Sequence, residues 1–225
     1  MTVLLQAHSL RKSFAHTEAL RGVSVEIGAG ETVAITGPSG SGKSTLLLCL
    51  AGILRPEAGE VIYDHQRLDL LGEADRTRLR RREMGVVLQF GQLVPELTAV
   101  QNVVLPLLLE KHDRASALRA ALSWLERLEA DHLADKVPVE LSGGEAQRVA
   151  VARALVTGPR VVFADEPTGA LDTVAGEQVL GQLLSATRDT AATLVMVTHD
   201  NRVAARADRV IVLSDGAVEG AGVAS

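Results

Sequence analysis

The stretch Gly37-Pro-Ser-Gly-Ser-Gly-Lys-Ser44 decides the fold class of this chain. It follows the apolar run Glu31–Thr36 and precedes a helical run that opens at Thr45, which is the context of a phosphate-binding loop between a strand and a helix. The glycines let backbone N–H groups turn toward phosphates, Lys43 supplies positive charge, and Ser44 offers a hydroxyl to Mg²⁺. The stretch therefore predicts an α/β nucleotide-binding domain.

Short apolar runs separated by segments of helical period predict a mostly parallel sheet. These runs are Met84–Leu88, Val161–Asp165, Leu194–Thr198 and Arg209–Leu213. Upstream, Val23–Ile27 and Glu31–Thr36 are expected to form a hairpin around Gly28-Ala-Gly30. Ligands of such a sheet gather at the carboxyl ends of its strands.

The character of the chain changes between Pro95 and Pro138, where strand signals vanish. Behind Asp113, a possible cap, apolar residues recur at helical spacing: Leu118, Ala121, Leu122, Leu125 and Leu128. We therefore expect a single domain over residues 1–225. Its α/β core, with an antiparallel β subdomain, comprises residues 1–94 and 139–225, and its helical subdomain comprises residues 95–138.

Composition narrows the class of partner. The 23 basic and 28 acidic residues give a net charge of −5, which argues against a nucleic-acid binder that works by phosphate neutralisation. The single cysteine, Cys49, lies in an apolar run and is expected to be a buried core thiol. The run Arg76–Arg82 fits RNA or anionic lipid, but its acidic neighbours favour a solvated helix face.

Targeting and membrane signals point to the cytoplasm. The first residues lack a basic region followed by an apolar run, so we expect no signal peptide. The apolar stretch Val103–Leu109 is far shorter than the roughly 20 residues that cross a bilayer, and it contains a proline. Any membrane role is therefore expected to come through a partner.

Two carboxylates follow the apolar run Val161–Phe163. Asp165 is suited to hold Mg²⁺, often through water, and Glu166 is then positioned to orient or deprotonate an attacking water. The alternative is a solvated pair that opens a turn before Pro167.

The segment Leu141-Ser-Gly-Gly-Glu145 precedes an amphipathic helical run that ends near Gly158. A glycine-rich helix start attracts anions, although Ser142 and Glu145 also match a plain capping box. The two consecutive glycines, which capping does not need, favour close approach to a phosphate. The phosphate loop of residues 37–44 and the pair Asp165-Glu166 already complete a phosphate site. This helix start, near residue 142, is therefore expected to serve a second copy of the chain.

These three segments resemble the Walker A, signature and Walker B motifs of the ATP-binding cassette (ABC) ATPases, and the resemblance covers nearly the whole chain. It implies that Phe14 stacks on adenine, that Gln89 senses Mg²⁺ and water, and that His199 contacts the γ-phosphate. The resemblance also implies that Asp172 belongs to the loop that crosses to the opposite subunit.

The resemblance implies ATP and Mg²⁺ as cofactors. Glu166, His199 and Gln89 are then the expected catalytic residues. Expected Mg²⁺ contacts are Ser44, Gln89 and Asp165. Expected ATP contacts are Phe14, Gly37, Ser39, Gly40, Ser41, Gly42, Lys43, Ser44, Thr45, Ser142, Gly143, Gly144 and Asp172.

Two positions depart from the family pattern. Phe14 stands where tyrosine is usual, which keeps the ring face and drops a hydroxyl; a core role for Phe14 stays open. Ala146 stands where glutamine is usual after the signature glutamate, which leaves phosphate contacts intact but alters the surface of the helix. For His199, the alternative is an ordinary surface or core histidine.

The stretches Gln89–Leu109 and Pro167–Asp172 are similar to the branch of the family that holds lipoprotein-release, macrolide-export and cell-division ATPases. The resemblance implies a transport ATPase that exports a drug, peptide or lipid-linked substrate. It would act as a dimer at the cytoplasmic face of the inner membrane, attached through a permease on a separate chain. The alternative is a mechanotransmitter that drives a cell-wall enzyme without transport. A soluble family member of translation or DNA repair would show tandem cassettes or an inserted coiled coil.

Overall fold

The computed structural model describes residues 2–89 and 91–223. The chain divides into two compact units, a first unit of Met1–Arg80 with Ala192–Ser225 and a second unit of Arg81–Ala191. The division falls inside α2 (Glu73–Glu83). The predicted helical subdomain, residues 95–138, belongs entirely to the second unit, and its boundaries within a single domain stay a prediction.

The first unit contains an antiparallel sheet in the order β2-β1-β4-β5. Its strands are β1 (Val3–Phe14), β2 (Thr17–Gly28), β4 (Ala58–Tyr63) and β5 (Gln66–Arg67). The predicted hairpin of Val23–Ile27 with Glu31–Thr36 is wrong. Val23–Ile27 alternates buried and exposed residues and pairs with β1, as suits a half-exposed antiparallel strand.

The other strands of the first unit lie in the order β10-β9-β3-β8. β3 (Thr32–Thr36) runs parallel to β8 (Thr193–Val197) and β9 (Arg209–Ser214), and β10 (Ala217–Val223) is antiparallel to β9. β3 and β8 are buried nearly throughout, which explains their continuous apolar sequences. The strands predicted at Leu194 and Arg209 are confirmed.

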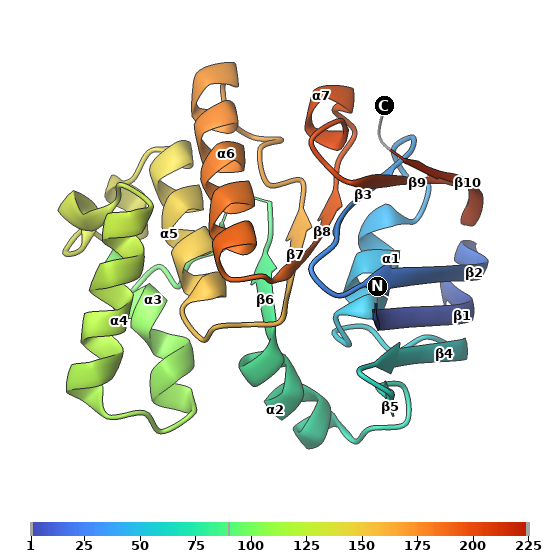
Figure 1. Cartoon of the computed structure of the whole chain (residues 1–225), viewed down its shortest axis with the longest axis horizontal. Helices are drawn as coiled ribbons and strands as arrows, with labels where there is room; N and C mark the ends of the chain where they lie inside the picture. Colours follow the sequence, from blue (N-terminus) through green and yellow to red (C-terminus); the bar gives the residue numbers. More distant parts are fainter. Residues whose placement is uncertain (1, 90, 224–225) are drawn as a thin grey trace. The chain divides into compact units, whose positions relative to one another are not determined.

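Helix α1 (Lys43–Leu50) packs against β1, β2 and β8 of the first unit (Figure 1). Its buried side chains include Leu46, Leu47 and Cys49. Burial of Cys49 raises the pKa of its thiol to about 11, because the charged thiolate loses hydration. The prediction of a core thiol is confirmed. The short helix α7 (Asn201–Ala204) follows β8.

The second unit combines two parallel strands with a group of helices (Figure 1). Helix α3 packs on α4 and α5, and α5 packs on α6 and β6. The elements are β6 (Met84–Val87), α3 (Ala99–Leu109), α4 (Arg114–Arg127), η1 (Asp131–Leu133), η2 (Pro138–Glu140), α5 (Gly143–Leu155), β7 (Val161–Asp165) and α6 (Thr173–Asp189). The strands predicted at Met84 and Val161 are confirmed, and so is the fold class, an α/β core with an antiparallel sheet.

Side chains cap the amino ends of all four α-helices that lie wholly in the second unit. The capping residues of α3, α4, α5 and α6 are Thr98, Asp113, Ser142 and Asp172. Each cap satisfies a backbone N–H that has no partner within the helix, which stabilises a helix by about 1 kcal/mol. The predicted cap Asp113 is confirmed, and local sequence alone sets where these helices begin.

The predicted apolar stripe of α4 is displaced in part. Ala117, Ala121 and Leu125 form its buried face, whereas Leu118 and Leu122 are 42% and 41% exposed. Spacing alone could not separate these two sets, because the helix carries apolar residues over a wide arc. The exposed leucines leave part of this apolar surface open to solvent.

The prediction of a solvated arginine face on α2 is wrong for Arg76. Arg76 is buried and pairs with Glu73, and its stem packs close to Gly52. Arg80 donates a hydrogen bond to the carbonyl of Gly52 at 2.7 Å. The long arginine stems bury their methylenes while their heads keep polar partners, so α2 is anchored by residues that composition marks as surface.

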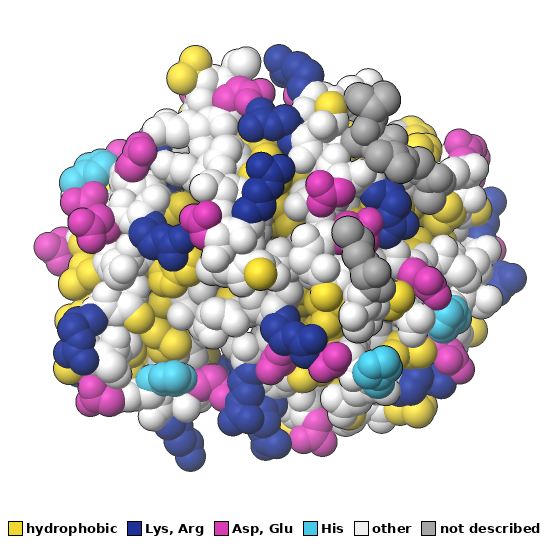
Figure 2. Space-filling view, viewed as in Figure 1, with side chains coloured by type: hydrophobic (Ala, Val, Ile, Leu, Met, Phe, Trp, Pro, Cys, Tyr) yellow, Lys and Arg dark blue, Asp and Glu magenta, His cyan; other side chains and the backbone are white. Residues whose placement is uncertain are grey.

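Figure 2 shows acidic and basic side chains interspersed on the face it draws. None of the helices that the structure describes combines the length and the apolar character needed to span a membrane.

Candidate nucleotide site

The phosphate loop follows β3 and is shaped by close backbone approach. A Cβ atom at Gly37, whose φ is 141°, would lie 1.9 Å from the carbonyl oxygen of Leu213 in β9. A Cβ at Gly42, with φ 98°, would lie 2.2 Å from the carbonyl oxygen of Ala19. Only glycine fits at these two positions, for both steric and conformational reasons.

The loop also shows features that suit an anion. Gly40 has φ 79° and nothing within 4 Å of the place of a Cβ. The Lys43 ammonium donates to the carbonyls of Gly37 at 2.9 Å and Pro38 at 2.7 Å, which holds its charge at the loop. No side chain caps α1 at Gly42, so its positive amino end stays available, and in the described residues the buried Ser41 hydroxyl has no hydrogen-bond partner.

The turn between β9 and β10 supports the loop from outside. The N–H of Gly216 donates to the carbonyl of Ser41 at 3.1 Å, and the Gly216 carbonyl accepts from the N–H of Arg21 at 2.7 Å. The loop conformation is thus held by residues distant in sequence but within the same unit.

Two further predicted residues lie in the first unit. Phe14 ends β1 with 47% of its surface exposed, and the Lys12 ammonium lies 5.5 Å from its ring centroid, so a purely core role for Phe14 is excluded. His199 stands between the buried Thr198 and Asp200, which caps α7. The hydrogen bond from Arg202 is the main reason that the pKa of Asp200 is lowered. The predicted ligand roles of Phe14 and His199 stay predictions.

In the second unit, β7 delivers Asp165 and Glu166 to its carboxyl end. Glu166 has a left-handed backbone, with φ 46°, and its carbonyl accepts from the N–H of Gly169 at 3.1 Å. Non-glycine residues seldom adopt this conformation, which costs free energy and concentrates at functional sites. The turn therefore aims the glutamate in a direction that a continued strand would not allow.

Gln89 and Glu166, far apart in sequence, meet at Gly169. A Cβ at Gly169 would lie 3.4 Å from Glu166 Oε2 and 3.5 Å from Gln89 Nε2. The second unit thus brings together the predicted catalytic base and the predicted Mg²⁺ sensor. The part played by Gly169 was missed by sequence reasoning, since nothing in the sequence marks a glycine as the meeting point of two distant side chains.

The signature segment begins α5 as a formed capping box. Ser142 Oγ accepts from the N–H of Glu145 at 3.3 Å, and Glu145 Oε2 accepts from the N–H of Ser142 at 2.7 Å. The bond from the Ser142 N–H is the main reason that the pKa of Glu145 is lowered. The capping box that the sequence offers as an alternative to anion binding is therefore formed. A contact with phosphate would be a second role of the same segment.

The two signature glycines also have a packing reason. A Cβ at Gly143 would lie 3.2 Å from Leu171 Cδ2, and one at Gly144 would lie 3.2 Å from Ala175 Cβ. The start of α5 thus packs tightly on the segment around Asp172, which caps α6 through the N–H of Ala175 at 2.9 Å. Helix packing thus requires small residues at both positions, so the two glycines are not by themselves a sign of phosphate contact.

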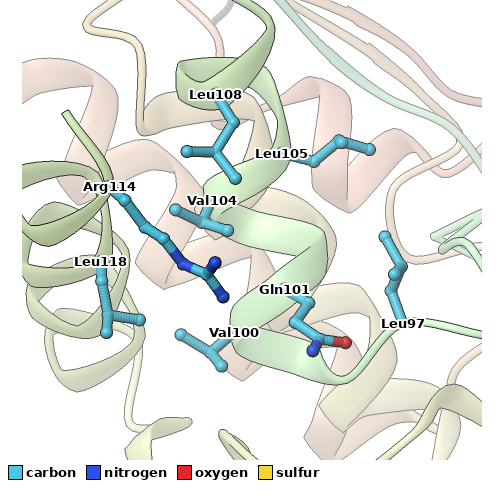
Figure 3. A pocket seen from close by; sticks show the side chains of 8 residues that line it. All are labelled: Leu97, Val100, Gln101, Val104, Leu105, Leu108, Arg114 and Leu118. Carbon is cyan, nitrogen blue, oxygen red and sulfur yellow. The ribbon is translucent and has the colours of Figure 1, made fainter. Parts of the chain in front are cut away.

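An apolar groove of about 400 Å³ lies elsewhere in the second unit, between α3 and α4 (Figure 3). Arg114, at the start of α4, extends its guanidinium across this groove toward α3. Arg114 forms no ion pair among the residues that the structure describes. The lining residues are Leu97, Val100, Gln101, Val104, Leu105, Leu108, Arg114 and Leu118.

The donor set fits Mg²⁺ better than a protein-only metal cage. Among the described residues, no three histidine, cysteine or acidic side chains form a cluster. Mg²⁺ usually takes one or two carboxylates together with substrate phosphates and water. Each predicted Mg²⁺ contact carries an oxygen atom that suits this metal: Ser44 in the first unit, and Asp165 and Gln89 in the second. Their ligand roles stay predictions.

A glycine-rich loop between a buried parallel strand and an uncapped helix, with two carboxylates at the end of another parallel strand, defines a phosphate-loop ATPase. The model of a protein family described as "ABC transporter" matches residues 20–169, which is more than half of the 225 residues. The chain belongs to this family, and it is an ABC ATPase whose cofactors are ATP and Mg²⁺.

Two relatives in sequence are named lipoprotein-releasing system ATP-binding protein LolD. The one from Syntrophotalea carbinolica is 45% identical over 222 residues, which cover 96% of this chain and 97% of the relative. The one from Xanthomonas oryzae is 45% identical over 219 residues, with 96% and 90% covered.

Solved structures agree with the family. The ATP-binding cassette MJ0796, in a dimeric post-hydrolysis state bound to ADP and Pi, superposes with a TM-score of 0.92, with 37% identity and 99% of each chain covered. The cbiO1 protein from Clostridium perfringens, part of the ABC transporter complex cbiONQ, has a TM-score of 0.88 and 30% identity, with 99% of this chain and 89% of cbiO1 covered.

Proposed function

We propose that the chain is the ATP-hydrolysing subunit of an exporter whose substrates are lipid-anchored proteins. The observation that carries this proposal is the 45% identity, over nearly the full length of both chains, to proteins named for lipoprotein release. The subunit works at the cytoplasmic face of the inner membrane and attaches to it through a permease on a separate chain.

Each predicted residue has a task that its chemistry suits. Lys43 and the loop N–H groups bind the phosphates, Glu166 orients the attacking water and accepts its proton, and His199 contacts the γ-phosphate. Bound Mg²⁺ neutralises phosphate charge. Gln89, which lies beside Glu166 at Gly169, adjusts the water and the metal together.

The working form is a pair of cassettes, in which the α5 start of one copy faces the nucleotide of the other. Two solved structures of MJ0796 are dimeric, which supports the pairing of cassettes. Exposed apolar side chains support it too: Val139, just before the signature segment, is 89% exposed, and Val174, just after Asp172, is 79% exposed. A second copy would cover both residues.

The groove between α3 and α4 receives an amphipathic helix of the permease. Its walls are apolar, and Arg114, which forms no ion pair within the described part of the chain, places a cation at the amino end of α4, where the helix dipole disfavours positive charge. An acidic residue on the incoming helix would relieve that cost.

We expect Arg114→Glu to lower permease-stimulated ATPase activity about tenfold while basal activity stays unchanged, because a hydrogen bond to a charged group contributes about 1.5–3 kcal/mol. Arg119→Glu, on the same helix, is the control and should leave both activities unchanged.

Capture of the permease tests the proposal as a whole. The Glu166→Gln chain should bind ATP, stay dimeric and turn over about 10²–10⁴ times more slowly, because a positioned base is removed. Expressed in its native host and solubilised with ATP, it should co-purify with a permease and a lipoprotein, whereas Lys43→Ala should not. Recovery of a cell-wall hydrolase would replace export with mechanotransmission, and soluble partners alone would overturn the proposal.

A further inference from the structure

Two side chains of α5 hold the main chain on both sides of Gln89. Gln147, which is buried, donates from Nε2 to the carbonyl of Leu88 at 3.3 Å. Arg153 donates from Nη2 to the carbonyl of Gly91 at 2.8 Å and from Nη1 to that of Gln92 at 3.0 Å. Within the described part of the chain, Arg153 pairs with no carboxylate, so its charge is committed to these two carbonyls.

The segment that Arg153 holds has an unusual backbone and rests directly on α5. Gly91 and Gln92 both have left-handed conformations, with φ of 69° and 43°. A Cβ at Gly91 would lie 3.1 Å from the carbonyl oxygen of Ala146. A left-handed glutamine persists only where its surroundings hold it, and the two bonds from Arg153 supply that restraint.

The same helix begins at the signature segment. From Gly144 to Arg153 it is a continuous helix of about 14 Å, at 1.5 Å per residue. A helix of this length moves as one body, so any displacement of its amino end reaches the carbonyls that Gln147 and Arg153 hold.

We propose that Gln147 and Arg153 form a latch through which the position of Gln89 follows the position of α5. Both are positioning residues, since neither is placed at the reacting atoms. The inference rests on the proposed pairing of cassettes, and it adds a route: engagement of the α5 start by the partner's nucleotide is transmitted within one chain to Gln89.

Hydrogen exchange tests the latch itself, without reference to any role of Gln89. We expect Arg153→Met to raise exchange at the amides of residues 91–94 at least tenfold, because bonds to a charged donor are lost. Arg148→Met is the matched control, since Arg148 lies on the same helix but bonds Gln178 of α6. Unchanged exchange in Arg153→Met, or equal changes in both variants, would overturn the latch.

A double-mutant cycle tests its consequence for catalysis. In the purified chain, Arg153→Met should lower kcat about tenfold and raise the half-saturating Mg²⁺ concentration, with KM for ATP nearly unchanged. Combined with Gln89→Ala, it should add less than twofold, because both changes act through one side chain. Arg153→Lys should restore part of kcat. Independent, multiplying effects would disprove the link to Gln89, and because no permease is present the result is separate from the export proposal.

Discussion

The two units hold their predicted site residues by different means. In the first unit, the phosphate loop is shaped by steric contact, since the carbonyls of Leu213 and Ala19 approach Gly37 and Gly42 so closely that no side chain fits. In the second unit, polar side chains hold the main chain around Gln89. Steric contact permits one conformation, whereas hydrogen bonds to carbonyls can follow a moving partner. We therefore expect the phosphate loop to be rigid and the main chain around Gln89 to be able to adjust.

Helix caps show the same contrast. All four helices α3 to α6 of the second unit satisfy their amino ends with their own side chains, whereas Gly42 at the start of α1 offers none. A helix end with no internal cap has N–H groups to give to an anion. A bound phosphate would therefore accept hydrogen bonds from the N–H groups at the amino end of α1, which no side chain caps.

The substitution with the greatest expected loss tests whether steric contact shapes the phosphate loop. Gly37→Ala should abolish ATP binding and lower the free energy of unfolding by about 3 kcal/mol or more, because its Cβ would overlap the Leu213 carbonyl. Gly40→Ala has open space and should cost only about 1–2 kcal/mol for its left-handed backbone. Binding of a fluorescent ATP analogue and urea unfolding measure both. Equal losses in the two variants would show that conformation, not contact, shapes the loop.

A smaller effect tests the polar side. The buried Asn102 accepts from the N–H of Val94 at 2.7 Å and donates to the carbonyls of Val94, Leu97 and Thr98. Asn102→Leu should lower the free energy of unfolding by about 2–3 kcal/mol, because it leaves these backbone groups unpaired. The control Asn201→Ala, at an exposed position, should stay within about 0.5 kcal/mol. Urea unfolding that shows no difference between them would contradict the importance of polar ties in this unit.

The smallest effect concerns the core of the first unit and depends on pH. Burial raises the pKa of Cys49 from its ordinary 9.0 to about 11, so the folded state favours the neutral thiol. Its contribution to stability is complete below pH 9 and is lost as pH rises toward 11. Between pH 7.5 and 10, the wild type should lose about 1 kcal/mol relative to Cys49→Ala. Parallel pH dependence of the two chains in urea unfolding would contradict the raised pKa.

Sequence patterns succeeded where the signal was local or continuous. The runs at Val161 and Leu194 were predicted as strands because strands buried on both faces are apolar throughout, and Asp113 was predicted as a cap from its neighbours alone. The hairpin of Val23–Ile27 failed because strand pairing is not local. The sequence did not single out Asn102, because it is one of two adjacent polar residues, with Gln101, in the otherwise apolar run Val100–Leu109, and only the fold shows which of the two is buried.

The class of the protein could be predicted from adjacent residues, since the glycine spacing of residues 37–44 and the pair Asp165-Glu166 are chemical requirements of phosphate binding and hydrolysis. The fold was needed to show which glycine makes which contact, that Gln89 and Glu166 meet at Gly169, and that Arg153 holds the segment after Gln89. The physical reason is distance along the chain. Local chemistry is written in adjacent residues, whereas steric limits and carbonyl partners come from segments that only folding brings together.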